Sequence, residues 1–280
     1  MEFDGKVVIV TGGAHGLGAA LVRRFSAEGA DVVVADIDLD AAREVATDVG
    51  GTAVAMDVGQ EADVRRGIEE TESEHGRVDV FFSNAGIGGG GHPWTPDATW
   101  ERMWRVNVLS NVYAARHVLP GMLRRGEGYL ASTASTTGIT TSTSDLVYAT
   151  TKHAQVAVAE WLAMAYGTRG IRVSVLCPRW MWTDMTRRAT AGDVPPWLQL
   201  AMSGGVTAEE AAAITLAGLH DERFLITTGE DTLEDFRRKA EDFDGWIRRL
   251  QTWHDELQPD VGPEQAPSAP HTAGSSCAST

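Results

Sequence analysis

The sequence predicts an α/β fold: a doubly wound parallel sheet of about seven strands with helices on both faces. Apolar runs rich in β-branched residues alternate with amphipathic stretches along most of the chain. The runs are nearly continuous in apolar residues, as in KVVIVT at residues 6–11, which is typical of strands buried on both faces. Helical stretches separate the runs, as parallel strands require. In such sheets ligands bind beyond the carboxyl ends of the strands, so the loops there are the expected sites.

Each expected element follows from its own pattern. The strand patterns span residues 6–11, 31–36, 52–56, 78–83, 128–134, 171–176 and 224–228. The helical patterns span residues 16–28, 39–49, 61–75, 98–123, 147–166 and 208–219. The segment 180–205 is irregular and contains Pro195 and Pro196.

The C-terminal part of the chain has a different character. Residues 231–257 form a charged amphipathic pattern, which predicts a helix that is broken or kinked near Gly245. Residues 259–280 are rich in Pro, Ser, Ala and Thr, so we expect a disordered tail. The predicted organisation is one domain over residues 1–258, including the helical extension, followed by that tail.

Composition excludes several classes of protein. The 280 residues are 43% hydrophobic, enough for one sizeable core, but no run of apolar residues is long enough to span a membrane. The polar start of the chain has no secretory signal, and Cys177 and Cys277 are too far apart to suggest a disulfide framework. These features predict a cytoplasmic protein. The net charge of −15 argues against nucleic acid or an anionic membrane as the main partner.

A glycine-rich turn follows the first strand. Residues 11–18 read TGGAHGLG, and a helix pattern begins at once. Glycines let the backbone approach a pyrophosphate closely, and the helix N-terminus offers N–H groups to the anion. A plain turn between strand and helix, with glycines for packing, is the alternative. The expected cofactor contacts in this turn are Gly12, His15, Gly16, Leu17 and Gly18, although exposure to solvent would equally explain His15.

Asp36 ends the second strand pattern and favours NAD over NADP. A carboxylate at this position accepts hydrogen bonds from the hydroxyls of an adenosine ribose and repels a 2′-phosphate. The next residue, Ile37, supplies no compensating cation and is the second expected contact of this region. The alternative is a solvated carboxylate or a helix N-cap, and Asp38 suits the cap better.

Tyr148 and Lys152 are four residues apart at the start of a long helix pattern, so they share one face. Tyrosine has a pKa of about 10 and is a poor base at neutral pH. An ammonium one turn away lowers that pKa, as would the positive ring of an oxidised nicotinamide. The spacing is common by chance and carries weight only together with other motifs.

Several motifs accompany this pair in a definite order. The glycine turn matches TGxxxGxG, Asn84-Ala85-Gly86 follows the fourth strand, and Asn107 lies in the long helix pattern before Ser135. In this order and spacing the chain, over roughly residues 4–230, resembles the short-chain dehydrogenase/reductase family with its Rossmann-type fold.

The resemblance implies a role for each matching residue. Tyr148 would be the general acid and base, and Ser135 would hold and polarise the substrate oxygen. Lys152 would bind the nicotinamide ribose and lower the tyrosine pKa. Asn107 would hold a water that links Lys152 to solvent as a proton relay.

Further matches imply cofactor contacts. Asp57 and Val58 match the pair that flanks adenine, and the Asn84 to Gly86 segment would support both the sheet and the cofactor. Thr183 matches a threonine that contacts the carboxamide, and Pro178 is expected beside the cofactor. The family usually has Pro-Gly where this chain has Pro178-Arg179. Arg179 would point to solvent, or reach an acidic substrate group or a cofactor phosphate.

Tryptophans indicate the substrate. Trp94, in the loop after the fourth strand, and Trp180, Trp182 and Trp197, in the irregular segment, suit a bulky apolar or aromatic alcohol or ketone. Packing of a lid or a subunit contact is an equally good explanation. The histidines have no metal-ligand spacing, and no metal is needed where Tyr148 and Ser135 polarise the oxygen.

The sequence therefore predicts an NAD-dependent enzyme that interconverts a secondary alcohol and a ketone. An NADPH-dependent carbonyl reductase, and a catalytically silent NAD-binding protein, are the alternatives. Asp36 argues against the first of these, and the complete catalytic set argues against the second. The resemblance also implies a homotetramer or a homodimer.

Overall fold

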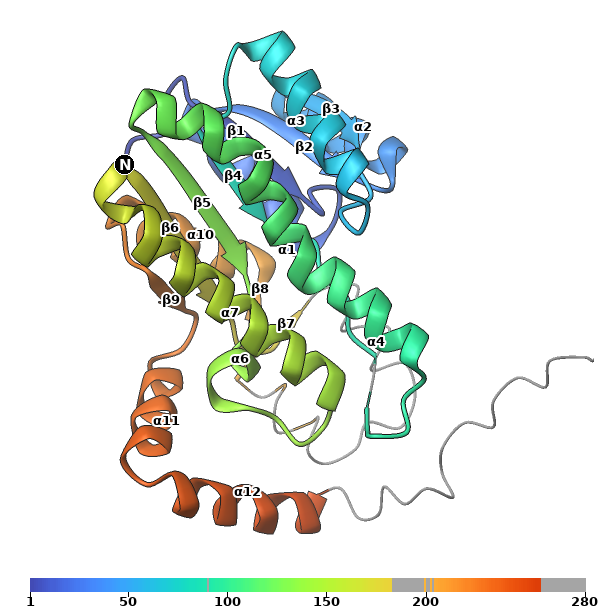
Figure 1. Ribbon diagram of the computed structural model, residues 1–280, viewed down its shortest axis with the longest axis vertical. Coiled ribbons are helices and arrows are strands. Elements are labelled where there is room, and N and C mark those ends of the chain that lie inside the picture. The colour runs from blue at the N-terminus through green and yellow to red at the C-terminus, as the bar shows by residue number, and fades with distance from the viewer. Residues whose placement is uncertain (90, 183–198, 200–201, 203, 258–280) are drawn as a thin grey trace, which may run out of the picture.

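The computed structural model describes residues 1–89, 91–182, 199, 202 and 204–257. Its centre is a seven-stranded parallel sheet in the order β3-β2-β1-β4-β5-β6-β9. The strands are β1 Val7–Thr11, β2 Asp31–Asp36, β3 Thr52–Ala55, β4 Val80–Ser83, β5 Gly128–Thr133, β6 Ile171–Cys177 and β9 Leu225–Thr227. This arrangement confirms the predicted doubly wound α/β fold (Figure 1).

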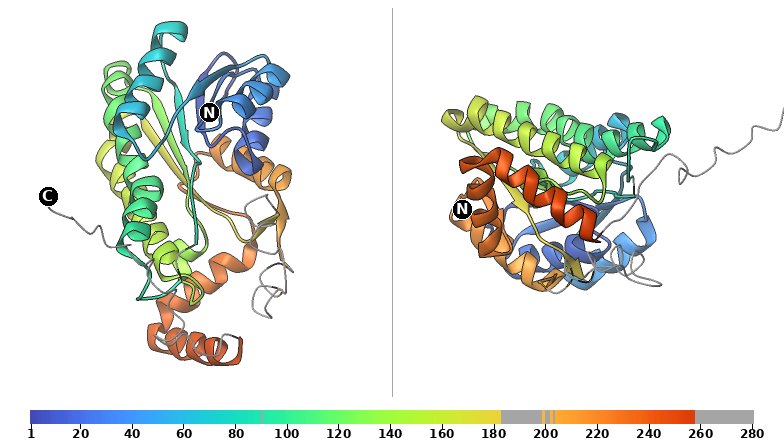
Figure 2. Two further views of the ribbon diagram at one scale, coloured as in Figure 1. Left: turned by 90° about the vertical axis from the view of Figure 1, so that its right-hand side faces the viewer. Right: turned by 90° about the horizontal axis from the view of Figure 1, so that it is seen from below.

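Helices cover both faces of the sheet (Figure 2). One face packs on α1 (Gly16–Ala27), α2 (Leu39–Val49) and α10 (Ala208–His220). The other packs on α3 (Glu61–His75), α5 (Ser110–Arg125) and α7 (Leu146–Tyr166). Central strands such as β1 and β4 are buried along their whole length, which explains their continuous apolar pattern.

The predicted helix over residues 98–123 is not one regular helix. It consists of α4 (Asp97–Trp104), a π-helical turn at Arg105–Leu109, and α5. Asn107 lies in that turn, and its side chain bonds both main-chain groups of Ile87, with Nδ2 donating to the oxygen and Oδ1 accepting from the nitrogen, each at 2.9 Å. A π turn inserts one residue into a helix and commonly marks a functional position. The turn places Asn107 against the loop after β4.

The C-terminal extension is two helices, α11 (Glu230–Glu241) and α12 (Phe243–Leu257). The helix is broken as predicted, and the break lies at Asp242, three residues before Gly245. Asp242 Oδ1 accepts from the Gly245 nitrogen at 2.8 Å and thereby caps the first turn of α12. Gly245 is part of that turn.

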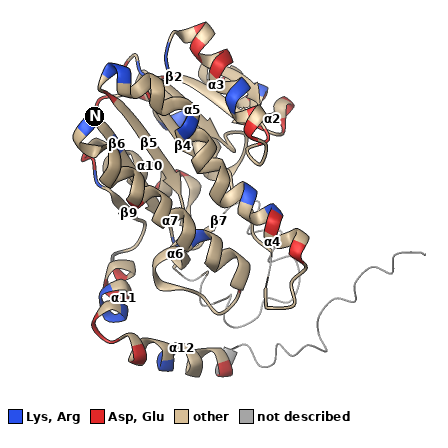
Figure 3. Cartoon of the chain, in the orientation of Figure 1, with Lys and Arg blue, Asp and Glu red and all other residues tan. Residues whose placement is uncertain are grey.

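The extension docks beside the loop that follows β5 (Figure 1). Trp246 of α12 is buried, and its Nε1 donates to the Thr140 oxygen of the short helix α6 (Thr137–Thr140) at 3.1 Å. Lys239 Nζ of α11 donates to the Ile139 oxygen at 2.8 Å. Both helices carry charges of both signs on their outer surface (Figure 3). The extension is therefore held to the segment directly behind Ser135.

A short strand lies near the start of the segment predicted as irregular, and another follows its end. These strands, β7 (Met181–Trp182) and β8 (Val206–Thr207), pair in parallel. The predicted tail at 259–280 lies outside the described residues. Within the described part of the chain, none of the helices is both long enough and apolar enough to cross a membrane.

Candidate active site

The turn between β1 and α1 is shaped for a close anion. Gly12 and Gly16 have φ values of +63° and +49°, which favour glycine. A Cβ at Gly18 would lie 1.9 Å from the Gly12 oxygen, so only glycine fits there. The N-cap residue His15 turns its ring to Asp38, with Nε2 3.3 Å from Oδ2, rather than capping the helix. The first N–H groups of α1 can therefore bind a pyrophosphate, and the turn fits a dinucleotide.

Substituting Gly18 by alanine tests this packing. The new methyl group meets main-chain atoms of Gly12, which cannot rotate away. We expect the free energy of unfolding to fall by about 1–3 kcal/mol and the affinity for NADH to fall with it. Denaturant unfolding and NADH fluorescence titration measure the two effects. Gly167→Ala is the matched control, since a Cβ at Gly167 would meet no atom within 4 Å. Wild-type NADH affinity in Gly18→Ala would contradict the assignment of the turn.

The Asp36 carboxylate lies against the glycine turn. Its side chain is 7% exposed at the end of β2. Oδ2 accepts from the Ala14 nitrogen at 3.1 Å, and Oδ1 accepts from the Asp38 nitrogen at 3.0 Å. Beside it, Ile37 is 75% exposed although it is apolar. An oriented carboxylate next to an apolar platform fits an adenosine with a ribose diol.

Asn84 ties together the ends of three neighbouring strands. Its Nδ2 donates to the Thr11 oxygen at 3.1 Å, and its Oδ1 accepts from Thr133 Oγ1 at 3.1 Å. Thr11 Oγ1 accepts from the nitrogens of Asn84 and Ala85. Asn84 thus joins β1, β4 and β5 at their carboxyl ends. Gly86 follows beside the lysine, where a Cβ would lie 3.4 Å from Lys152 Nζ.

The Asp57-Val58 pair follows β3 at the same edge of the sheet. Asp57 Oδ1 accepts from the Gly59 nitrogen at 2.9 Å, and Val58 is buried. The Asp57 nitrogen donates to Asp63 Oδ2 at 3.3 Å. These bonds fix the loop at the β3 end of the predicted cofactor site.

Ser135 and Tyr148 meet across the end of β5. Asp145, the N-cap of α7, accepts from the Tyr148 nitrogen at 2.8 Å and begins the helix there. Ser135 is buried directly after β5, and its Oγ accepts from the Thr137 nitrogen at 3.2 Å. The Ser135 hydroxyl lies close enough to that of Tyr148 to favour its ionised form. A substrate oxygen at this pair would meet both hydroxyls.

Lys152 lies one turn along α7 and is only 3% exposed. Its Nζ is 5.5 Å from the centroid of the Tyr148 ring. It donates to the Thr133 oxygen and to Gln155 Oε1, each at 2.9 Å. The structure therefore brings Ser135, Tyr148 and Lys152 together as the sequence predicts, with Asn107 on the neighbouring helix.

Burial controls the ionisation of this group. It raises the pKa of Tyr148 to about 12, although the nearby Ser135 hydroxyl opposes the shift. Burial lowers the pKa of Lys152 to about 8. Burial thus acts on the tyrosine in the direction opposite to the lowering that was expected from Lys152. A positive nicotinamide ring would place a second cation near Tyr148, beside Lys152, and would lower the pKa of the tyrosine.

Asn107 is fully buried, with its amide committed to protein groups. Nδ2 donates to the Ile87 oxygen and to Thr151 Oγ1, and the main-chain oxygen accepts from Asn111 Nδ2 at 2.9 Å. The predicted water relay stays a prediction. The Asn107 main-chain oxygen already accepts from the Asn111 side chain.

Two loops flank Ser135, because β4 and β6 lie on either side of β5. In the loop after β4, Trp94 is 45% exposed, and the centroid of its ring lies 5.7 Å from that of the His92 ring. In the second, the Pro178 oxygen accepts from the Thr136 nitrogen at 3.0 Å, and Trp182 is 37% exposed. Trp180 is partly buried. Two further predicted contacts, Thr183 and Trp197, lie outside the described residues.

Arg179 has a partner that the sequence did not suggest. Its guanidinium pairs with Asp231 at the start of α11, and its main-chain nitrogen donates to Thr228 Oγ1 at 3.0 Å. The residue thus ties the loop after β6 to the C-terminal extension. The sequence could not show this pair, because the partners are distant in the chain and unrelated by any pattern.

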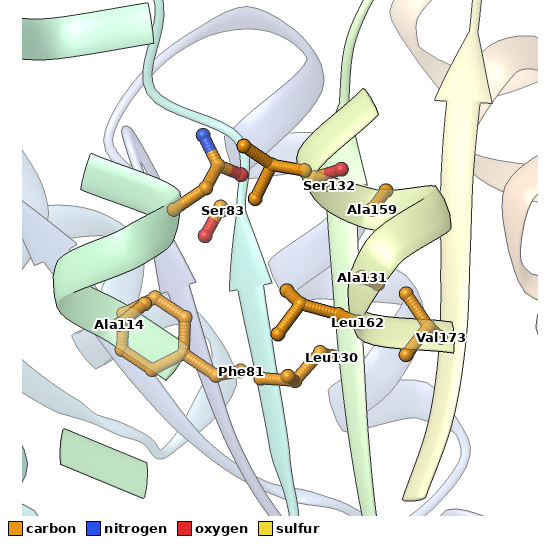
Figure 4. A pocket seen from close by; sticks show the side chains of 11 residues that line it. Phe81, Ser83, Ala114, Leu130, Ala131, Ser132, Ala159, Leu162 and Val173 are labelled. Atoms are coloured by element: carbon orange, nitrogen blue, oxygen red, sulfur yellow. The ribbon is translucent and has the colours of Figure 1, made fainter. Parts of the chain in front are cut away.

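A small internal cavity lies behind the site, between the sheet and the helices α5 and α7 (Figure 4). Its volume of about 20 Å³ has room for one water molecule. Ser83 and Ser132 line it among apolar side chains such as Phe81 and Leu162. It is too small to be the substrate site.

The family model for short chain dehydrogenase matches residues 6–193. The chain belongs to the short-chain dehydrogenase family. It is 35% identical to meso-2,3-butanediol dehydrogenase from Serratia marcescens over 66% of this chain and 75% of that protein. It is 33% identical to 1-deoxy-11-beta-hydroxypentalenate dehydrogenase from Streptomyces exfoliatus over 86% of this chain and 90% of that protein.

Solved structures agree with this family assignment. A short chain dehydrogenase/reductase from Burkholderia phymatum, in complex with NAD, superposes with a TM-score of 0.78. The two share 29% identity over 87% of this chain and 96% of the other. Together the comparisons establish an oxidoreductase of this family with a dinucleotide-binding sheet, related to dehydrogenases that act on alcohols and ketones.

Sequence reasoning about this family member missed three residues at the site. Thr133 and Gln155 accept from Lys152, and Asn111 bonds to Gln155 and to Asn107. Gln155 had a detectable signal: it follows Lys152 by three residues on the same helical face. Thr133 acts through its main chain, which leaves no trace in the sequence.

Proposed function

We propose that this dehydrogenase oxidises a secondary alcohol to a ketone with NAD, and catalyses the reverse reduction. The observation that carries the proposal is that Ser135 and Tyr148 meet at the end of β5 beside the buried amine of Lys152. Asp36 supports NAD, because its carboxylate at the end of β2 would bind a ribose diol and repel a 2′-phosphate. The NAD complex of the Burkholderia phymatum relative supports the same cofactor.

The chain's own residues would work as follows. Ser135 Oγ donates a hydrogen bond to the substrate oxygen and fixes it beside Tyr148. Tyr148 Oη takes the hydroxyl proton during oxidation and returns it during reduction. Lys152 binds the nicotinamide ribose and supplies a positive charge near the tyrosinate. NAD, when bound, supplies the hydride acceptor at its nicotinamide ring. One hydride and one proton thus leave the alcohol, and transition-state charge on oxygen meets two fixed donors.

We propose a bulky, largely apolar substrate. Trp94 and Trp182, on the two loops that flank Ser135, keep more than a third of their surface exposed. Flat aromatic side chains at the rim of a site bind large apolar rings well. The Streptomyces exfoliatus relative is named as a dehydrogenase of 1-deoxy-11-beta-hydroxypentalenate.

A cofactor and substrate panel tests the proposal. Purified protein is mixed with bulky and small secondary alcohols and with NAD or NADP in parallel, and reduced nicotinamide is followed by absorbance. We expect turnover with NAD, faster for the bulky alcohols. Turnover with NADP alone would indicate the NADPH-dependent reductase instead. Tight NADH binding without turnover of any alcohol or ketone would indicate a silent binding protein.

A further inference from the structure

A chain of buried amides runs from Lys152 to the π turn. Gln155 is 1% exposed and Asn111 is 8% exposed, and both lie between α5 and α7. Lys152 Nζ donates to Gln155 Oε1 at 2.9 Å, and Gln155 Nε2 donates to Asn111 Oδ1 at 3.4 Å. Asn111 Nδ2 then donates to the Asn107 main-chain oxygen at 2.9 Å. Side chains therefore span the distance between Lys152 and the Asn107 carbonyl.

The hydrogen bonds of this chain all run in one direction. A lysine ammonium only donates, so the group of Gln155 that faces it must be the amide oxygen. That leaves the Gln155 amide nitrogen for Asn111, whose oxygen must accept and whose nitrogen must donate to Asn107. The side-chain amides of Gln155 and Asn111 can therefore make these hydrogen bonds with only one placement of their oxygen and nitrogen atoms. An apolar side chain at either position would leave buried polar groups without a partner.

The ammonium has three N–H donors, and two of them are fixed by the protein. Thr133 takes one and Gln155 takes the second, from different elements of the fold. This leaves the third donor for the cofactor ribose. The two fixed bonds also favour the charged form of an amine that burial would otherwise neutralise.

We propose that Gln155 is a positioning residue that holds Lys152 charged and in place, and that Asn111 keeps the oxygen of Gln155 turned toward it. The inference deepens the proposed function, on which its catalytic meaning rests. Neutral amides take up no proton in this pH range. The row of amides therefore holds the lysine in position and does not conduct protons.

Few titratable groups act on this lysine. Tyr148 lies one turn away on α7, and Asp145 caps the same helix. The Cys177 thiol at the end of β6 also faces Lys152, but burial raises its pKa to about 12, so it is neutral under working conditions. The described groups that face the amine from α5, the π turn and β5 are neutral. Gln155 is therefore a main support of the charge.

The test uses the small number of lysines in the chain. Only Lys6, Lys152 and Lys239 occur. Protein labelled with ¹³C at the lysine ε-carbon gives three signals, which Lys6→Arg and Lys239→Arg assign. Titration of the third signal measures the pKa of Lys152 in the whole chain without any substrate, so the result does not depend on turnover.

We expect Gln155→Met, which is similar in length but offers only a weak thioether acceptor, to lower the pKa of Lys152 by about one to two units. Gln155→Glu keeps an acceptor, adds a negative charge, and should raise that pKa above the wild-type value. Thr215→Val is the matched control: Thr215 is equally buried, but it bonds Ala211 within α10 on the opposite face. It should leave the Lys152 titration unchanged.

Wild-type titration of Lys152 in folded Gln155→Met would overturn the inference. If Gln155→Met does not fold, Gln155→Glu decides: an unchanged pKa there also overturns it. Where turnover exists, the alkaline limb of its pH profile should move to lower pH in Gln155→Met and to higher pH in Gln155→Glu. A protein that shows the expected titrations but no alcohol turnover would disprove the proposed function. The inference that Gln155 holds Lys152 charged would still stand.

Discussion

Substituting Tyr148 by phenylalanine is expected to lower kcat for alcohol oxidation by about 10²- to 10⁴-fold, the range for loss of a general acid or base. The ring still fills its place beside Gly88, which lies against Tyr148 Cδ2 and Cε2, so the site should keep its shape. Only the hydroxyl that takes the proton is removed. Steady-state kinetics with the best alcohol of the panel measure the effect.

Two controls separate chemistry from structure. NADH affinity should stay close to the wild-type value in Tyr148→Phe, because the cofactor contacts of Lys152 and the glycine turn remain. Tyr113→Phe makes the same chemical change on α5, where the ring faces Arg116, and should leave kcat unchanged. Equal losses in both variants, or no loss in Tyr148→Phe, would show that Tyr148 does not move the proton.

The second large effect concerns the cofactor. The double variant Asp36→Ser with Ile37→Arg removes the carboxylate at the ribose end and adds a guanidinium for a 2′-phosphate. We expect kcat/KM with NAD to fall roughly 10- to 10²-fold, the value of hydrogen bonds to a charged group. We expect kcat/KM with NADP to rise, so that the preference reverses.

The single variant Ile37→Arg is the matched control for this switch. It keeps the Asp36 carboxylate, which should still repel the 2′-phosphate, so NADP should remain the poorer cofactor. Asp36 also accepts hydrogen bonds from the nitrogens of Ala14 and Asp38, so the unfolding free energy of both variants is measured as well. Unchanged NAD preference in a stable double variant would show that Asp36 does not select the cofactor.

The strands were predictable because they are buried on both faces. β2 matches its pattern residue for residue, and no end of the other strands differs from its prediction by more than two residues. The π turn at Arg105–Leu109 and the helix break at Asp242 were not predictable. Each depends on hydrogen bonds, to Ile87 in the first case and to Gly245 in the second, rather than on the period of apolar residues.

The site divides in the same way. Ser135, Tyr148 and Lys152 could be chosen from sequence because their order and spacing match the motifs of one family, and the structure places them together. The amides of Gln155 and Asn111 could not be chosen from sequence, because Asn111 lies on another helix. The pairing of Arg179 with Asp231 could not be predicted either, since nothing in a local pattern identifies a partner on the C-terminal extension.

The central claim is direct transfer of a hydride from an alcohol to NAD. The measurement that tests it uses the best secondary alcohol of the panel with deuterium on its carbinol carbon, together with NAD and the purified protein. Mass spectrometry and NMR of the products should show one deuterium at the nicotinamide C4 of NADH, on a single face, and the unlabelled ketone. Deuterium lost to water, or NADH formed without label, would contradict the claim.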